Sequence, residues 1–371
     1  MERAPKQEQE PAAETVSEVG PNVLRMQLPI RMPGLGHVNC YALLDEDGAA
    51  IVDPGVPGPS SWRALTHRLR GAGLRIRDVH TVIVTHSHPD HFGGAGRLAQ
   101  EAQAELVSHA SFRTWSTGSD SEPCTNDSPG GRGDETGGDG DEKSPESSGP
   151  NPWGEPVPWG GRKFKPPWRQ RLAFRIMRTR LVPGFVSPRP TRRVRDGDVL
   201  RLAGREWVAV HSPGHTLDHI CLYDPERNVL LSGDHVLPTI TPHVAGIGSG
   251  RDPLADFVAS LDKVAALGEV TDVLPAHGHP FGDLTGRIAA IKAHHVERLD
   301  RVRAIAAALG PATVSDFSHE LFRRDRWGHM AESETYAHLE HLRLAGEAHR
   351  YEGSDGLVYV IESEAHSSTP A

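Results

Sequence analysis

Residues 85–91 read THSHPDH, so three histidines and one aspartate fall within six positions. Imidazole nitrogens and a carboxylate gathered in so short a stretch suit borderline divalent ions, zinc first, with iron or manganese as alternatives. The cluster directly follows residues 79–84, a short β-branched apolar run typical of a strand buried on both faces. We therefore expect a metal site on a turn leaving a buried strand. The simpler alternative is a polar turn whose aspartate caps the next helix.

Three later segments also place a ligand-type residue directly after a predicted strand. The strands and the residues that follow them are 206–210 with His215, 228–231 with Asp234, and 271–274 with His277 and His279. A sheet-based fold gathers its site at the carboxyl ends of its strands. These side chains are therefore expected to meet the cluster at 85–91.

Short apolar strands alternating with amphipathic helices are expected to position these residues. The other predicted strands are 39–44, 49–52, 105–107, 198–202 and 219–223. Helices are predicted at 59–70, 94–104, 252–267, 284–310, 313–321 and 333–345. A serine of 59–61 should cap the first helix, and Asp252 should cap the helix at 252–267, with Pro253 in its first turn. Two final strands, 349–351 and 357–361, complete the outline of a winged-helix module.

The composition is that of a globular protein. The chain has 371 residues, 37% of them hydrophobic and 24% charged, with a formal net charge of −9. This length predicts about two or three domains. No apolar window approaches about 18 residues, so no membrane span is expected, and the first twenty residues do not resemble a secretory signal. Three distant cysteines predict neither disulfides nor a thiolate zinc site, which favours a cytoplasmic location.

Four segments differ in composition from the rest. Residues 1–22 and 364–371 are expected to be disordered tails. Residues 116–151 hold eight Gly and nine Asp/Glu against two Arg/Lys, which predicts a low-complexity acidic insertion. Residues 162–195 hold twelve Arg/Lys and no acid, with apolar residues at helical spacing. This basic segment is either a solvated helix paired with the acidic insertion or a lid over an anionic substrate.

The motifs together resemble the metallo-β-lactamase fold superfamily. Further matching segments are 39–41 (NCY), 52–55 (VDPG), 212–216 (SPGHT) and 231–235 (LSGDH). The resemblance covers residues 23–290 and implies an α/β fold, the αββα sandwich of two sheets flanked by helices. It also implies that His86, His88 and His215 hold one metal ion, that Asp90, His91 and His277 hold a second, and that Asp234 bridges them.

This ligand set implies a dinuclear hydrolase. Two divalent ions can hold a hydroxide between them near neutral pH, so no serine or cysteine nucleophile is needed. Asp90 has a second, catalytic task, which is to orient the hydroxide by a hydrogen bond. His279 is either a proton donor or substrate contact, or a residue outside the reacting centre.

A closer resemblance is to the LACTB2-like branch, in which a winged-helix-like domain follows the catalytic domain, here over residues 291–363. That branch includes both thioesterases and endoribonuclease-like proteins. Residues 311–364 hold five Arg and eleven Asp/Glu, whereas a winged helix that grips a phosphate backbone needs a basic face. This acidic module is expected to pack on the catalytic domain, to form a homodimer, or to wall the active site.

We therefore favour hydrolysis of a small, anionic ester, thioester or lactone. A metal-dependent endoribonuclease or phosphodiesterase is the alternative, with nucleic acid as the substrate. A non-catalytic, metal-stabilised binding protein is a third and weaker hypothesis.

Overall fold

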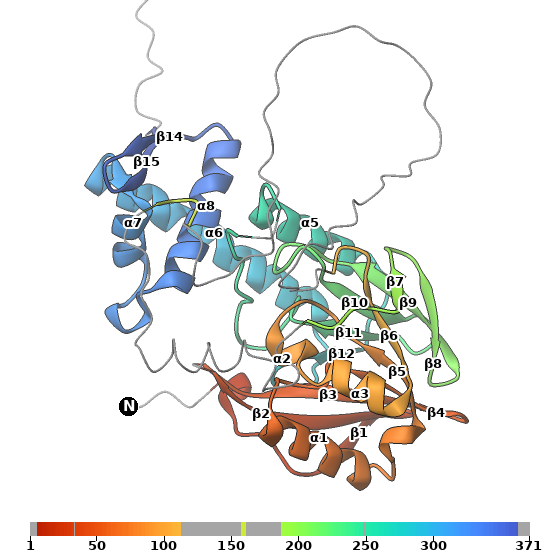
Figure 1. Cartoon of the computed structure of the whole chain (residues 1–371). Helices are drawn as coiled ribbons and strands as arrows, with labels where there is room; N and C mark the ends of the chain where they lie inside the picture. Colours follow the sequence, from red (N-terminus) through yellow and green to blue (C-terminus); the bar gives the residue numbers. More distant parts are fainter. Residues whose placement is uncertain (1–5, 33, 113–156, 161–186, 248–249, 363–371) are drawn as a thin grey trace, which may run out of the picture.

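The computed structural model describes residues 6–32, 34–112, 157–160, 187–247 and 250–362 (Figure 1). The acidic insertion predicted at 116–151 and the tail at 364–371 lie outside these residues. The basic segment at 162–195 is described only from residue 187 onward, where β7 (Arg192–Val194) joins a sheet. The predicted lid therefore stays a prediction.

The first sheet contains seven strands that lie side by side in the order of the sequence. They are β1 (Val16–Gly20), β2 (Val23–Met32), β3 (Leu35–Asp45), β4 (Gly48–Val52), β5 (Val79–Ile83), β6 (Glu105–His109) and β7. The strands from β1 to β4 pair antiparallel, and those from β4 to β7 pair parallel. Helices α1 (Pro59–Gly71) and α3 (Ala95–Ala102) pack on its outer face. Gly58 precedes α1 and no serine side chain caps it, so the predicted serine cap was wrong.

The second sheet contains five strands in the order β12-β11-β10-β9-β8. Their bounds are β8 (Val199–Leu202), β9 (Arg205–His211), β10 (Ile220–Asp224), β11 (Val229–Gly233) and β12 (Asp272–Pro275). Helices α5 (Pro253–Ala265) and α6 (Leu284–Leu309) cover its outer face. Asp252 caps α5 by accepting a hydrogen bond from the Ala255 N–H, as predicted.

Alternating side chains fill three layers of core around the two sheets. Along β3, Cys40 and Ala42 face the helices, whereas Tyr41 and Leu43 face the second sheet. Strand β10 alternates in the same way between the inner core and the core under α5 and α6. This period of two is the pleat of a strand buried on both faces. The predicted αββα sandwich is confirmed.

The carboxyl ends of four strands meet at one edge of this sandwich. Strands β9, β11 and β12 run in the same direction, since β10 is antiparallel to both β9 and β11, and β11 is parallel to β12. Strand β5 of the first sheet delivers its end to the same edge, where the Ile220 N–H donates to the Thr85 carbonyl at 2.9 Å. The Asn39 N–H likewise donates to the Ala276 carbonyl at 2.7 Å, so the two sheets are joined here.

The C-terminal module lies beyond the sandwich and uses the distal half of α6 (Figure 1). It adds β13 (Ala312–Thr313), α7 (Val314–Leu321), α8 (His329–Leu344), β14 (Ala348–Gly353) and β15 (Gly356–Ile361). The three strands form an antiparallel sheet in the order β13-β15-β14. These elements occur near their predicted positions, but the identification as a winged helix stays a prediction. No helix of the described residues is long and apolar enough to span a membrane.

The predicted domain boundary at residue 290 falls inside the continuous helix α6. The module also receives a short segment from elsewhere in the chain. Trp159 is 3% exposed within its core, and the Trp159 carbonyl accepts a hydrogen bond from the Leu357 N–H. Besides α6, this segment therefore ties the module to an earlier part of the chain.

The prediction of a disordered tail over residues 1–22 was wrong for the part that the structure describes. Strand β1 pairs with β2, and the 3-10 helix Gln7–Gln9 carries Glu8, whose side chain is fully buried. The Glu8 carboxylate accepts hydrogen bonds from the Thr239 N–H at 2.8 Å, the Ile240 N–H at 3.0 Å and the Thr239 hydroxyl. The sequence carries no sign of this order, because the segment has few apolar residues and is held in place by polar contacts to distant backbone.

Replacing Glu8 with Ala should lower the free energy of unfolding by about 1–3 kcal/mol, because the backbone N–H groups of Thr239 and Ile240 lose the carboxylate that accepts their hydrogen bonds. Urea denaturation of the metal-free protein measures the effect. Glu14→Ala, at an exposed position in the same segment, is the matched control and should change stability little. Equal stability of the two variants would contradict the structural role of Glu8.

A pair of buried histidines joins α6 to α8. The rings of His295 and His338 stack with centroids 5.4 Å apart, and their facing nitrogens are 3.2 Å apart. Burial lowers the pKa of His295 to about 3 and the pKa of His338 to about 4, since a charged imidazole is poorly solvated there. Unfolded imidazoles protonate near pH 6.5. The unfolded state therefore binds more protons between pH 6.5 and 4, and stability falls as the pH falls through that window.

Replacing His338 with Gln should make stability less sensitive to acid, by up to about 1.4 kcal/mol per pH unit for the one proton removed. Urea unfolding at several pH values, with a chelator present throughout, measures the slope free of metal binding. His67→Gln, at an exposed position of α1, is the control and should leave the slope unchanged. A slope for His338→Gln as steep as that of the unchanged protein would refute this interpretation.

Candidate metal centre

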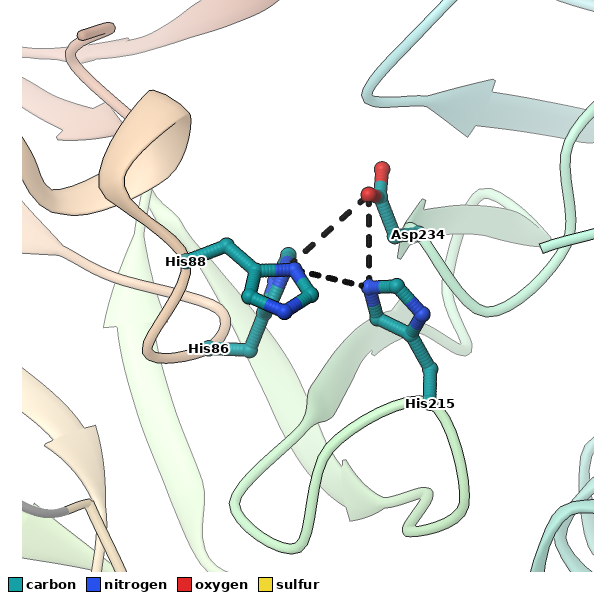
Figure 2. Close-up of side chains that lie close together, drawn as sticks. All are labelled: His86, His88, His215 and Asp234. Atoms are coloured by element: carbon teal, nitrogen blue, oxygen red, sulfur yellow. Dashed lines mark hydrogen bonds and ion pairs between the residues drawn. The ribbon is translucent and has the colours of Figure 1, made fainter. Parts of the chain in front are cut away.

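Three histidine nitrogens converge at the edge where the strands end (Figure 2). His88 Nδ1 lies 2.9 Å from His86 Nε2 and 3.0 Å from His215 Nε2. Asp234 Oδ2 lies 3.5 Å from His215 Nε2 and 3.9 Å from His86 Nε2. These four side chains form the first candidate cluster, and their ligand atoms all lie within 4.8 Å of one another.

Asp90, His91 and His277 form a second cluster against the other side of Asp234. Asp90 Oδ2 lies 3.7 Å from His91 Nε2 and 3.6 Å from His277 Nε2. Asp234 Oδ1 lies 3.3 Å from His277 Nε2, while its Oδ2 is 3.5 Å from His91 Nε2. Asp234 therefore stands between the clusters: its Oδ1 faces His277 of the second, and its Oδ2 lies near imidazoles of both. The structure brings together all seven residues that the family resemblance assigned as ligands, but not His279, which was also expected to meet the cluster.

Local structure explains how residues so close in sequence reach both clusters. The turn after β5 carries His86 and His88, and Pro89 then begins the short helix α2 (Pro89–Phe92). Proline fits a first helical turn because its missing N–H needs no partner there. The helical turn swings Asp90 and His91 toward the second cluster, so one segment supplies ligand-type atoms to both.

Three of the imidazoles are oriented through their other nitrogen. His215 Nδ1 donates to the His243 carbonyl at 2.7 Å, and His277 Nδ1 donates to the His37 carbonyl at 2.7 Å. His91 Nδ1 donates to Asp53 Oδ2 at 2.8 Å. With a proton held on that nitrogen, Nε2 presents a lone pair toward the centre, as a metal ligand must.

Asp53 is a functional residue to which sequence reasoning gave no role. It follows β4, and besides His91 it accepts hydrogen bonds from the backbone N–H and the hydroxyl of Thr85, at 2.9 and 2.7 Å. It therefore fixes both a ring of the second cluster and the turn that leads to His86. The sequence pattern could have revealed Asp53, because the VDPG segment places a carboxylate at the end of a strand, as the other site segments do.

A second overlooked residue, His219, supports the backbone under Asp234. The Asp234 N–H donates to His219 Nε2 at 3.0 Å. At Gly233 the backbone has a φ of +52°, and an added Cβ would lie 2.5 Å from that same nitrogen. Glycine is needed here because the chain passes against a buried imidazole before it delivers Asp234.

The electrostatics divide the imidazoles into two kinds. Burial, reinforced by neighbouring imidazoles, holds the pKa values of His86 and His88 well below the ordinary range, so both rings are neutral. Burial also opposes charge on His91 and His277, but the carboxylates of Asp234 and Asp90 outweigh it and raise the pKa of each. Positive charge is thus favoured next to the carboxylates.

Orphaned polar atoms show that the centre fits metal ions. His91 Nε2, His277 Nε2 and Asp234 Oδ1 are buried, and none finds a hydrogen-bond partner among the described residues. Buried polar atoms are rarely left without partners in native proteins. Nitrogen and carboxylate ligands in two groups around a shared aspartate supply what divalent ions require. The clusters are suited to binding two metal ions.

His279 does not point into either cluster. Its Nε2 lies 2.8 Å from Glu10 Oε2, its Nδ1 lies 3.3 Å from Arg25, and its backbone N–H donates to the Gln7 side chain. Of the two roles considered for His279, this geometry favours the one outside the reacting centre. Its contacts tie the loop after β12 to the N-terminal segment.

Comparison with known proteins agrees with this geometry. The model of the metallo-beta-lactamase superfamily matches residues 33–314, which is most of the chain. The chain belongs to the metallo-beta-lactamase superfamily.

Two curated relatives carry thioesterase names. The human acyl-coenzyme A thioesterase MBLAC2 (Homo sapiens) is 30% identical over 266 residues, which cover 66% of this chain and 74% of that protein. The atrochrysone carboxyl ACP thioesterase AgnL7 of Paecilomyces divaricatus is 35% identical over 132 residues, which cover 34% of this chain and 40% of that protein. The MBLAC2 relationship fits the LACTB2-like branch indicated by the sequence motifs.

A solved structure matches almost the whole chain. The crystal structure of a metallo-beta-lactamase family protein from Thermus thermophilus is 27% identical, with a TM-score of 0.67, and the match covers 93% of this chain and 100% of that one. This member of the superfamily is a metal-dependent hydrolase.

Replacing Asp53 with Asn should weaken binding of one divalent ion by about 10–100-fold, the usual effect of removing a partner behind a metal ligand. Asparagine has one acceptor oxygen where Asp53 uses two, so its amide would face an N–H or O–H donor. Titration of Zn²⁺ against a chromophoric chelator measures the loss.

The matched control is Asp45→Asn. Asp45 also pairs with a histidine, at 3.1 Å from His80, but takes no part in either cluster. Unaltered affinity for both ions in Asp53→Asn would show that His91 needs no such support.

Proposed function

We propose that this protein hydrolyses small acyl thioesters, using two divalent ions of which zinc is the favoured one. The observation that carries the proposal is the convergence of two sets of ligand-type atoms around Asp234. The choice of thioesters over other esters is supported by the names of the two relatives, MBLAC2 and AgnL7.

The ligand assignment follows the two clusters. His86, His88 and His215 would hold one ion, Asp90, His91 and His277 would hold the other, and Asp234 would bridge them. Such a pair of ions, when bound, lowers the pKa of water toward neutrality and polarises a carbonyl group. Iron and manganese suit the same nitrogen and oxygen donors and are the alternatives to zinc.

The chain's own side chains prepare the site for this chemistry. Asp90 lies at the junction of His91 and His277, where a carboxylate oxygen would accept a hydrogen bond from the attacking water and orient it. Asp53 and the carbonyls of His37 and His243 hold the rings in place. Little rearrangement is then needed at the moment of reaction.

The leaving group also favours a thioester. A thiol has a pKa near 8.5, so a thiolate can depart without receiving a proton. An alkoxide from an ordinary ester is far more basic and gains more from a proton donor. His279, the histidine considered for that task, is bound to Glu10 and Arg25 instead.

The charge of the C-terminal module disfavours the alternative substrate, RNA. Residues 311–364 hold five Arg and eleven Asp/Glu, whereas binding to a phosphate backbone depends on clustered cations. A small-molecule substrate fits this charge better.

The test is a substrate panel on purified protein loaded with Zn²⁺, Mn²⁺ or Fe²⁺. The panel contains short- and long-chain acyl thioesters of coenzyme A and pantetheine, the matched oxygen esters, a lactone and a single-stranded ribo-oligonucleotide. We expect two ions per chain and release of free thiol, detected with a thiol reagent. Cleavage of RNA without thioester turnover would favour the endoribonuclease, and two bound ions with no hydrolysis would favour a binding protein.

Asp234→Asn should reduce the bound metal below two ions per chain and lower thioester turnover by more than about 100-fold, beyond the usual effect of an outer partner. Asp78→Asn is the control, because Asp78 pairs with Arg75 at the surface, away from both clusters. Near-normal metal content and turnover in Asp234→Asn would contradict the bridging role.

A further inference from the structure

The loop that follows Asp234 connects the metal centre to the C-terminal module. Residues 237–247 contain no helix or strand, so their backbone depends on contacts with neighbouring elements. At the middle of this loop the His243 carbonyl accepts the hydrogen bond from His215 Nδ1. The position of one loop carbonyl therefore sets the orientation of one imidazole of the first cluster.

Helix α8 holds the far half of this loop. Glu334 Oε2 lies 3.3 Å from His243 Nδ1. The side chain of His243 is therefore bound to α8, while its backbone carbonyl orients His215. Three residues further on, the Gly246 N–H donates to the carbonyl and the hydroxyl of Ser333. An added Cβ at Gly246 would lie 2.5 Å from a Tyr336 ring carbon, so the loop is pressed closely against α8.

Other elements hold the near half of the loop. Arg287, in the first turn of α6, donates to the Leu237 carbonyl at 2.5 Å and the Ile240 carbonyl at 2.6 Å. Glu8 accepts hydrogen bonds from the backbone N–H groups of Thr239 and Ile240. The start of the loop is therefore fixed independently of the C-terminal module, whereas the stretch around His243 depends on α8.

A residue of α6 in turn holds the Glu334 side chain in place. Arg298 NH1 donates to Glu334 Oε1 at 3.0 Å, and each of the two side chains is 17% exposed. Burial would raise the pKa of the Glu334 carboxyl, but His243 and Arg298 lower it to about 2. Glu334 is therefore a carboxylate at neutral pH, held from one side by a guanidinium and facing an imidazole on the other.

We propose that Glu334 is a positioning residue for the metal centre, acting through His243 on His215. The C-terminal module then has a defined task, which is to set one ligand of the first cluster from α6 and α8. This inference rests on the proposed role of His215 as a metal ligand. It predicts an effect confined to one of the two ions, because His277 and His91 are oriented by His37 and Asp53.

The experiment compares Glu334→Gln and His243→Ala with the unchanged protein and with Glu332→Gln. Glu332 lies on the same helix and accepts a hydrogen bond from the Trp159 indole rather than from the loop, so it is a matched control. Zn²⁺ and Co²⁺ are titrated into metal-free full-length protein against a chromophoric chelator, and the visible absorption of bound Co²⁺ is recorded. Melting temperatures of the metal-free proteins report whether each variant is folded.

We expect Glu334→Gln and His243→Ala each to weaken one of the two binding steps by about 10–100-fold and to leave the other unchanged. The Co²⁺ spectrum should change for that step alone, and Glu332→Gln should match the unchanged protein. In the double variant the loss should not exceed that of His243→Ala alone, because the two residues act in series. If Glu334→Gln fails to fold, His243→Ala still tests the prediction, since its side chain is partly exposed.

Other outcomes overturn the proposal. Unchanged affinities in both variants would show that the carbonyl of His243 needs no support from α8. Equal weakening of both steps, or additive losses in the double variant, would indicate a general structural effect. If the protein without substitutions binds fewer than two ions, the ligand assignment of the proposed function is wrong. Failure of that assignment is thus distinguishable from failure of the role proposed for Glu334.

Discussion

The centre of this protein is an arrangement of polar groups that repel one another unless positive charge lies between them. Three imidazole nitrogens face each other at about 3 Å, and Asp234 and Asp90 converge on the same buried space. Buried lone pairs without donors are costly in the interior of a protein. Divalent ions remove that cost, so folding and metal binding are linked at this site. The surrounding structure must hold the ligands together against their mutual repulsion.

The strand ends, and hydrogen bonds that involve backbone groups around the site, provide that restraint. Hydrogen bonds between the two sheets, such as those from Asn39 to Ala276 and from Ile220 to Thr85, fix the distance between the segments that carry the ligands. A loop alone could not do this, because its backbone has too many accessible conformations. The close packing of the inner core, with Trp207 fully buried, then transmits the restraint from one sheet to the other.

Local patterns in the sequence predicted the parts of this design that depend on neighbours in the chain. Alternating apolar residues revealed most strands. Residues that follow strand ends pointed to the seven candidate ligands and also to His279, and the family resemblance supplied the ligand set. Long-range polar contacts left no such pattern. Glu8 binds backbone 231 residues away, so the N-terminal segment looked disordered although it is held in place. The carbonyls that orient His215 and His277 could not be found either, since any residue type supplies a carbonyl.

The charge of the C-terminal module takes on a different meaning once α6 is included. Residues 311–364 hold more acids than arginines, and the arginines of α6 lie before this range. Two of these, Arg298 and Arg303, lie 3.0 Å from Glu334 and 2.8 Å from Glu347. The module's acids therefore bind cations that would otherwise be free to bind phosphate. Because α6 also runs unbroken into the catalytic sandwich, these pairs join the module to that sandwich, and a nucleic-acid surface on this face becomes still less favourable.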